Sequence, residues 1–342
     1  MNSGIRISVI GAGLIGKRHI EIAKTLDCLE SIVDPSEQAQ SLANNLNVKH
    51  YSSINDMLSD GKTAGAIVAT PTPMHMENTK LLVNAGIATL VEKPIADNLT
   101  EARRIVELAD QKNVALMVGH HRRHNPLISA AKARIESGSI GSLVALHAVC
   151  WLYKPADYFD IPWRTQKGAG PLLTNLIHDI DLMRHFAGDV HSVQMSESNH
   201  TRNHEIEDTA VLLLKFKNHT LATMSVSDTI VAPWSWELTA NENPAYPHTE
   251  QSCYYIGGTH GSIAIPEMQH WHATDKRSWY EHISHSEIPT ETEDPLATQI
   301  KHLCSVVEGT ETPLVTGWDG LQTLEVLDAA GRASALGREV VI

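Results

Sequence analysis

The feature that most constrains this chain is an apolar run that passes directly into a glycine-rich turn. Residues 7–10 read Ile-Ser-Val-Ile and residues 11–16 read Gly-Ala-Gly-Leu-Ile-Gly. The uncharged run predicts a strand buried on both faces, and the G-x-G-x-x-G spacing predicts a turn into a helix over 14–25. Gly11 would allow the tight turn, Gly13 would let the backbone approach a pyrophosphate, and Gly16 would let the helix pack close to the strand. The alternative is a glycine turn in another kind of α/β protein. The residues expected at a dinucleotide are Gly11, Gly13, Leu14, Ile15 and Gly16.

An acidic residue follows the second apolar run. Residues 29–33 predict a strand, and Asp34 comes directly after it, eighteen residues beyond Gly16. A carboxylate there can accept hydrogen bonds from both ribose hydroxyls and would repel a 2′-phosphate. The sequence therefore favours NAD as the cofactor, with NADP as the less favoured alternative because nearby cations can outweigh one carboxylate.

Length and charge restrict the class of protein. A chain of 342 residues is long enough for two domains, and 27 basic against 40 acidic residues give a net charge of −13. This balance argues against nucleic acid or anionic lipid as a partner. We expect no membrane span and no signal peptide, since no apolar run approaches about 18 residues. The four cysteines are widely spaced, as in a reduced, cytoplasmic protein.

Strand and helix patterns alternate over the first 120 residues, which predicts a parallel sheet with helices on both faces. After Asn125-Pro126 long strand patterns dominate, and they predict a mainly antiparallel open sheet. We therefore expect an α/β protein with a Rossmann domain over 1–124 and an α+β substrate-binding and oligomerisation domain over 125–342. The later strands are expected at 142–151, 191–199, 208–217, 220–230, 234–240 and 253–265, and the later helices at 127–137, 171–187, 294–308 and 319–335.

Two motifs end predicted parallel strands, at the edge of the sheet where open α/β proteins bind ligands. The backbone of Thr70-Pro71 could line one side of a nicotinamide site, or the two residues could form a simple turn. Glu92-Lys93-Pro94 places a lysine at the same edge, where its ammonium could hydrogen-bond a substrate hydroxyl and stabilise the alkoxide. Glu92 could orient that lysine or bind a cofactor ribose.

A third motif opens the helix expected over 171–187. Thr174 and His178 are four residues apart and Asn175 and His178 three, so the three would share a helix face. A histidine with polar neighbours is a plausible proton acceptor, although a lone helical histidine is more often structural.

Other polar and aromatic groups are less specific. Neither His120-His121 with His124 nor His270 with His272 has the spacing of a zinc site, so we expect no metal. The basic turn after residue 118 could line the cofactor site or be a solvated turn. The loop over 151–164 is aromatic and could stack on a cyclic substrate or make core or subunit contacts. Its candidate residues are Tyr153, Lys154, Trp163 and Arg164.

Together these motifs resemble the glucose–fructose oxidoreductase / inositol dehydrogenase / MocA family over nearly the whole chain. The resemblance implies hydride transfer at a secondary alcohol or ketone of a sugar or cyclitol, a homodimer or homotetramer formed through the C-terminal sheet, Lys93 as the catalytic lysine and His178 as the general acid/base. It also implies residues along the cofactor, namely Thr70, Pro71, His75, Glu92, Lys93 and His121, to which we add Arg164. The expected substrate contacts are Arg122, Tyr153, Lys154, Trp163, Thr174 and Asn175.

One position departs from the family. Many polyol-oxidising members have an aspartate where this chain has Thr174, four residues before the histidine. The departure argues against inositol-like substrates and leaves room for a dihydrodiol or a carboxylated ring held by Arg122, Lys154 or Arg164. We therefore predict an NAD-dependent dehydrogenase. The alternatives are an NAD-retaining glycosidase of the same family and a non-catalytic NAD-binding regulator.

Overall fold

The computed structural model describes residues 4–274 and 276–342, which form two compact units. The first unit contains residues 1–125 and 293–324, and the second contains 126–292 and 325–342. The chain first passes between the units from Asn125 to Pro126, and the domain limits of 1–124 and 125–342 stay a prediction. The chain then returns to the first unit and leaves it again within α10 (Gly317–Leu336).

The first unit contains a six-stranded sheet in the order β3-β2-β1-β4-β5-β6, in which every pairing is parallel. This is the doubly wound order typical of dinucleotide-binding domains, as predicted. Its strands are β1 (Ile7–Ile10), β2 (Leu29–Val33), β3 (Lys49–Tyr51), β4 (Gly65–Val68), β5 (Ala88–Val91) and β6 (Leu116–Val118). Its helices are α1 (Leu14–Thr25), α2 (Glu37–Leu46), α3 (Ile54–Asp60), α4 (His75–Asn84) and α5 (Leu99–Lys112).

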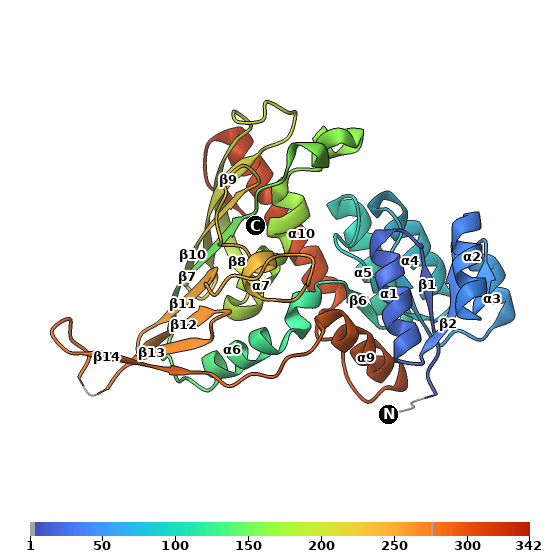
Figure 1. Cartoon of the computed structure of the whole chain (residues 1–342), viewed down its shortest axis with the longest axis horizontal. Helices are drawn as coiled ribbons and strands as arrows, with labels where there is room; N and C mark the ends of the chain where they lie inside the picture. Colours follow the sequence, from blue (N-terminus) through green and yellow to red (C-terminus); the bar gives the residue numbers. More distant parts are fainter. Residues whose placement is uncertain (1–3, 275) are drawn as a thin grey trace. The chain divides into compact units, whose positions relative to one another are not determined.

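A helix from late in the sequence completes the core of this unit. Helix α9 (Pro295–Glu308) packs beside α1 and contributes Ile300 and Leu303, both fully buried, to the cluster around β1 and β4 (Figure 1). Asp294 caps α9 by accepting hydrogen bonds from the backbone N–H groups of Leu296 and Ala297. The sheet would otherwise expose apolar side chains on this face.

The second unit contains a nine-stranded sheet in the order β14-β13-β12-β11-β7-β10-β9-β8-β15. Only the pairing of β7 with β10 is parallel, which confirms the predicted, mainly antiparallel sheet. Its strands are β7 (Leu143–Trp151), β8 (Val190–Ser198), β9 (Thr209–Phe216), β10 (Leu221–Ser227), β11 (Tyr254–Gly258), β12 (Gly261–Ile265), β13 (Gln269–Ala273), β14 (Ile283–Glu287) and β15 (Val340–Val341).

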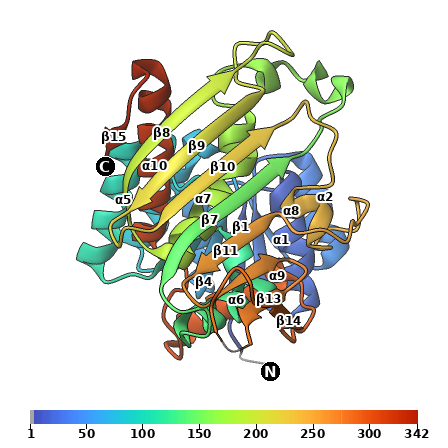
Figure 2. The same ribbon diagram turned by 90° about the vertical axis from the view of Figure 1, so that its left-hand side faces the viewer.

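The helices of this unit cover one face of its sheet. Buried and exposed residues alternate along β9 and β10, so each strand has one face in the core. In Figure 2 the opposite face of β8, β9, β10 and β7 is turned to the viewer and no helix lies in front of it. The helices are α6 (Pro126–Glu136), α7 (Ile177–Ala187), α8 (Trp236–Thr239) and the end of α10.

Three predicted elements differ from the structure. The strand expected at 234–240 is the short helix α8, because Ser235 accepts a hydrogen bond from the Leu238 N–H and caps a helical turn that buries Trp236. The strand expected at 253–265 is a hairpin of β11 and β12. The helix expected from 171 begins as a π turn over Leu172–Leu176 before α7. The sequence patterns also gave no prediction of β3, α3, β13 or β14.

The glycine turn gives a test of the packing. A Cβ on Gly16 would lie 2.0 Å from the backbone oxygen of Gly11, whereas a Cβ on Gly331 of α10 would meet no atom within 4 Å. We expect Gly16→Ala to lower the free energy of unfolding by about 1–3 kcal/mol. Gly331→Ala should raise it by about 0.5–1 kcal/mol, because alanine favours a helix. Urea unfolding of both variants measures the difference, and equal stabilities would contradict the packing described.

Candidate active site

The glycine turn leaves room for a ligand at one of its three glycines. Gly11 has a φ of +94°, and a Cβ on it would lie 2.7 Å from the Ala69 oxygen, so this position and Gly16 are fixed by packing. A Cβ on Gly13 would meet nothing within 4 Å. Gly13 also precedes α1 without any side-chain cap, so the first N–H groups of the helix face this space. The site therefore fits a pyrophosphate. Leu14 is 94% exposed beside it.

Asp34 lies at the end of β2 and is bonded to the glycine turn. Its carboxylate accepts hydrogen bonds from the Ala12 N–H at 2.8 Å and the Ser36 N–H at 2.9 Å. Burial raises the pKa of the Asp34 carboxyl, but the hydrogen bonds from Ser36 and Ala12 outweigh burial and the pKa lies below its usual value. A fixed negative charge thus lies next to the turn, where it would oppose a 2′-phosphate.

The side chain of His75 contacts two loops at the same edge of the sheet. It lies at the start of α4, and its ring nitrogens are each 2.8 Å from a backbone oxygen, Nδ1 from that of Pro94 and Nε2 from that of Thr70. The Thr70 hydroxyl accepts a further hydrogen bond from Asn78 at 3.0 Å. His75 is 1% exposed, so its role in this structure is to hold the loops after β4 and β5.

Glu92 and Lys93 come directly after β5. The Glu92 carboxylate is 7% exposed, lies 2.7 Å from Nε2 of His19 and accepts a hydrogen bond from the Lys93 backbone N–H at 3.2 Å. Burial raises its pKa, but the His19 hydrogen bond and the charges of His19, His121 and Lys93 lower it to about 2. Glu92 is therefore ionised at neutral pH. The Lys93–Pro94 peptide is cis.

The basic turn after β6 is a 3-10 helix over His121–His124. Arg122 is only 3% exposed, and Arg123 forms an ion pair with Asp319 at 3.2 Å. The turn is therefore part of the folded unit and not a solvated loop. Its His121 acts electrostatically on Glu92.

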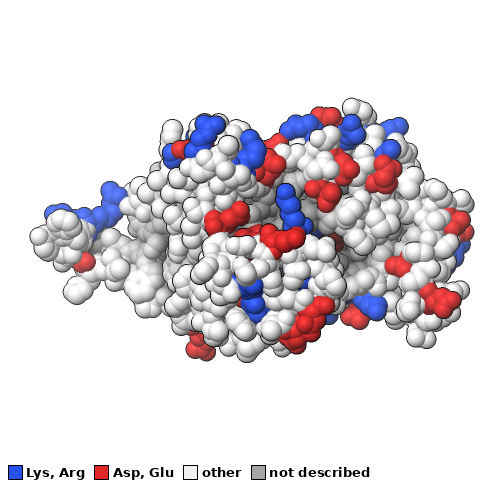
Figure 3. Space-filling model, turned by 90° about the horizontal axis from the view of Figure 1, so that it is seen from above, with Lys and Arg blue, Asp and Glu red and all other residues white. Residues whose placement is uncertain are grey.

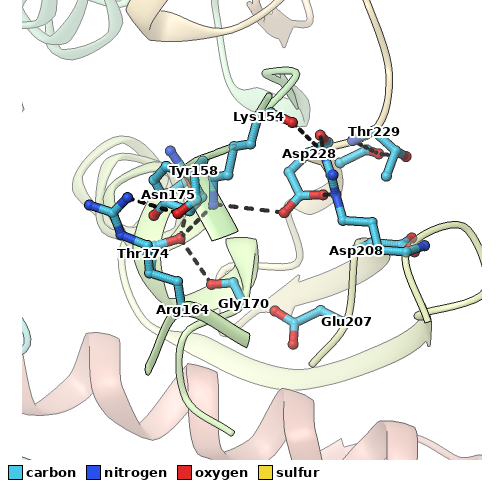
Figure 4. A network of polar contacts seen from close by, with 12 residues as sticks. Lys154, Tyr158, Arg164, Gly170, Thr174, Asn175, Glu207, Asp208, Asp228 and Thr229 are labelled. Carbon is cyan, nitrogen blue, oxygen red and sulfur yellow. Dashed lines mark hydrogen bonds and ion pairs between the residues drawn. The ribbon is translucent and has the colours of Figure 1, made fainter. Parts of the chain in front are cut away.

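In the second unit, the π turn before α7 carries the polar residues expected near His178. The hydroxyl of Thr174 is 3.0 Å from both the Gly170 oxygen and Oδ1 of Asn175 (Figure 4). Asn175 donates a hydrogen bond to Glu237 at 3.3 Å. A π turn advances more slowly around the axis than an α turn, so it keeps Thr174 one turn below His178. His178 itself is 7% exposed.

A buried ammonium group contacts this turn. Lys154, 7% exposed, donates a hydrogen bond to the Thr174 hydroxyl at 3.2 Å, and its Nζ lies 3.9 Å from Oδ2 of Asp228 (Figure 4). Burial lowers the pKa of Lys154, against the charges of Asp228 and other carboxylates. Asp228 already forms a 2.6 Å ion pair with Arg202. The Lys154 ammonium has three N–H donors, and it makes one hydrogen bond in this structure.

The aromatic loop is held by two arginines. The Arg164 guanidinium lies 4.1 Å from the centre of the Tyr158 ring and donates a hydrogen bond to the backbone oxygen of Tyr158 at 2.9 Å. Arg202 lies 4.5 Å from the ring centre of Phe159. Tyr153 and Trp163 are 50% and 55% exposed, and the guanidinium groups of Arg202 and Arg164, respectively, lie 5.7 Å from the centres of their rings. Arg164, which we expected at the cofactor, is therefore engaged within the loop of the second unit.

Sequence reasoning missed the residues that support these side chains, among them His19, Arg202 and Asp228. His19 follows the last glycine of the turn by three residues on α1, and this short spacing is a usable signal. Asp228 comes directly after β10, and this position is a weaker signal. The histidine clusters at 120–124 and 270–272 form no metal site: within the described ranges, no three His, Cys, Asp or Glu residues are placed to hold an ion.

On the face drawn in Figure 3, acidic and basic side chains are interspersed. Among residues 4–274 and 276–342, no helix is long and apolar enough to cross a bilayer. The thiols of Cys28, Cys150, Cys253 and Cys304 are buried.

Comparison with known proteins gives two family matches. The model described as "Oxidoreductase family, NAD-binding Rossmann fold" matches residues 5–120, and the "GFO/IDH/MocA C-terminal domain" matches residues 128–264. The rhizopine catabolism protein MocA of Rhizobium meliloti is 28% identical over 187 residues, which are 54% of this chain and 57% of that protein.

Two further proteins match nearly the whole chain. The scyllo-inositol 2-dehydrogenase (NAD(+)) of Bacillus subtilis is 27% identical and the match covers 99% of this chain and 97% of that protein. The WlbA dehydrogenase from Bordetella pertussis, solved in complex with NADH and UDP-GlcNAcA, has the same fold, with a TM-score of 0.77, 24% identity and coverage of 99% and 98%. These matches confirm the predicted NAD-binding domain and the class of NAD-dependent oxidoreductase.

Proposed function

Because this chain belongs to the GFO/IDH/MocA oxidoreductase family, we propose that it oxidises a secondary alcohol, or reduces the matching ketone, of a sugar, cyclitol or related cyclic compound. The observation that carries the proposal is the position of Lys93. It ends β5 at the same edge of the sheet as the glycine turn and Asp34, where ligands of parallel sheets bind. Bound NAD supplies the acceptor or donor of the hydride.

The side chains of this chain handle the proton of the substrate hydroxyl. The Lys93 ammonium donates a hydrogen bond to that oxygen and stabilises the negative charge that develops on it as the C–H bond breaks. His178 accepts the hydroxyl proton during oxidation and returns it during reduction. Thr174 and Asn175 lie one turn earlier and offer hydrogen bonds but no carboxylate.

Replacement of the lysine tests the proposed reaction. A panel of sugars, cyclitols, dihydrodiols and sugar acids with NAD, followed by NADH absorbance, identifies a substrate. The appearance of free NADH distinguishes a dehydrogenase from an NAD-retaining glycosidase. With that substrate, Lys93→Ala should lower kcat at least about 100-fold while NAD still binds. Lys80→Ala, which removes an exposed lysine of α4, is the control. Wild-type turnover by Lys93→Ala would show that the mechanism is wrong.

Within this class we propose a substrate that carries a carboxylate, recognised by Lys154. The ammonium is buried, has one hydrogen bond and shares Asp228 with Arg202. Burying such a group is unfavourable without acceptors for its protons. A substrate carboxylate would provide them, next to the turn that leads to His178. The exposed rings of Tyr153 and Trp163 support the proposal, since they offer apolar faces for a ring.

Paired substrates test this role. We compare hexuronates with the corresponding hexoses, which differ only in the carboxylate. A charge-assisted hydrogen bond contributes about 1.5–3 kcal/mol, so kcat/KM should favour the acid by roughly 10–100-fold in the wild type. Lys154→Met should abolish the preference, and Lys167→Met, at an exposed lysine of the same loop, should keep it. If Lys154→Met retains the preference, another residue recognises the carboxylate.

We also propose that two copies pair through the uncovered face of the nine-stranded sheet. Val144, Val211, Leu221 and Tyr255 are between 46% and 51% exposed on its strands. Such a surface is more apolar than a monomer usually exposes to water. Light scattering should give at least twice the 37.5 kDa chain mass. Leu221→Glu should shift the protein to the monomer, whereas Val231→Glu, at an exposed loop position, should not. A monomeric wild type at micromolar concentration would exclude the pairing.

A further inference from the structure

A buried hydrogen bond connects the cofactor-binding helix with the end of β5. His19 lies on α1, is fully buried, and its Nε2 is 2.7 Å from Oε1 of Glu92. A carboxylate accepts hydrogen bonds only, so Nε2 carries the proton and donates it. The other carboxylate oxygen accepts the backbone N–H of Lys93. Glu92 is therefore bound on one side to α1 and on the other to the residue proposed to be catalytic.

The backbone is shaped to leave room for this carboxylate. A Cβ on Gly119, the residue after β6, would lie 2.9 Å from Oε2 of Glu92 and 3.0 Å from its Cδ. Any side chain at this position would displace the carboxylate. The Gly119 N–H also donates to the Val91 oxygen at 2.8 Å, which holds it against the end of β5. Space and hydrogen bonds together keep Glu92 in one position.

A buried carboxylate is unfavourable unless its charge is compensated. The groups whose charges act on Glu92 are His19 from α1, His121 from the turn after β6, and Lys93 from its own strand end. The His19 hydrogen bond keeps Glu92 ionised in the interior. The negative charge in turn favours the charged form of Lys93, since an opposite charge nearby stabilises an ammonium.

We propose that His19 and Glu92 are positioning residues for Lys93, which keep its side chain protonated and fix the backbone from which it extends. The inference rests on the catalytic role proposed above for Lys93. Since His19 belongs to the helix whose first turn fits the pyrophosphate, the same pair joins the cofactor-binding helix to the lysine.

Removing the charge without changing the shape tests the electrostatic part. Glu92→Gln removes the carboxylate. The pH at which Lys93 loses its proton should then fall by about one unit. The extent of Lys93 acetylation by acetic anhydride at different pH values, read by peptide mass spectrometry, measures this directly and needs no substrate. The alkaline limb of kcat/KM should move by the same amount. Glu77→Gln, at an exposed position on α4, is the control.

Two further positions test the geometry. His19→Phe should lower the pH at which Lys93 loses its proton, as Glu92→Gln does. His19→Gln keeps a side-chain N–H, so its Lys93 titration should lie closer to that of the wild type. Gly119→Ala should reduce kcat by displacing the carboxylate. If the variants lower the melting temperature while the Lys93 titration stays at the wild-type pH, the pair is only structural and the inference is wrong.

The result for Lys93→Ala separates this inference from the proposed function. If Lys93→Ala keeps turnover while Glu92→Gln shifts the labelling curve, the catalytic role fails and the electrostatic coupling stands. If Lys93→Ala loses turnover and Glu92→Gln leaves both the labelling curve and the alkaline limb in place, the coupling alone is wrong.

Discussion

The in-register parallel pairing of four strands determines where the glycine turn, Thr70 and Lys93 lie in the first unit. Ile10 pairs with Val68, Val68 with Val91, and Val91 with Val118. These four apolar residues are at most 3% exposed, so a slip of register would move buried side chains out of the core. The next residue of each strand therefore falls in one row across the sheet. That row contains Gly11, Ala69, Glu92 and Gly119.

This row explains several close contacts that are far apart in sequence. Gly11 meets the backbone at Ala69, and Gly119 meets the Glu92 carboxylate, because each pair occupies neighbouring places at the strand ends. A side chain larger than hydrogen is excluded at both glycines for the same reason. The loops that leave this row carry Thr70 and Lys93. A single backbone arrangement thus brings the glycine turn, Thr70 and Lys93 to one edge of the sheet.

The sequence was most informative where function depends on one strand and the few residues after it. The glycine turn, Asp34 and Lys93 each follow a short apolar run, so their common edge could be predicted from strand order alone. The pairs that support them could not. Glu92 and His19 are 73 residues apart, and Lys154 and Asp228 are brought together by the pairing of β7 with β10. Local apolar patterns also cannot separate a capped helical turn from a strand, as Ser235 and Trp236 demonstrate.

The return of the chain to its first unit affects the order in which the protein is made. Ile300 and Leu303 of α9 complete a core whose strands end at Val118. At about 5–20 residues per second, the ribosome needs roughly ten to forty seconds to extend the chain from residue 125 to the end of α9. During that interval the six-stranded sheet has one apolar face without its helix. The nascent protein is therefore most exposed to aggregation between the synthesis of residue 125 and that of α9.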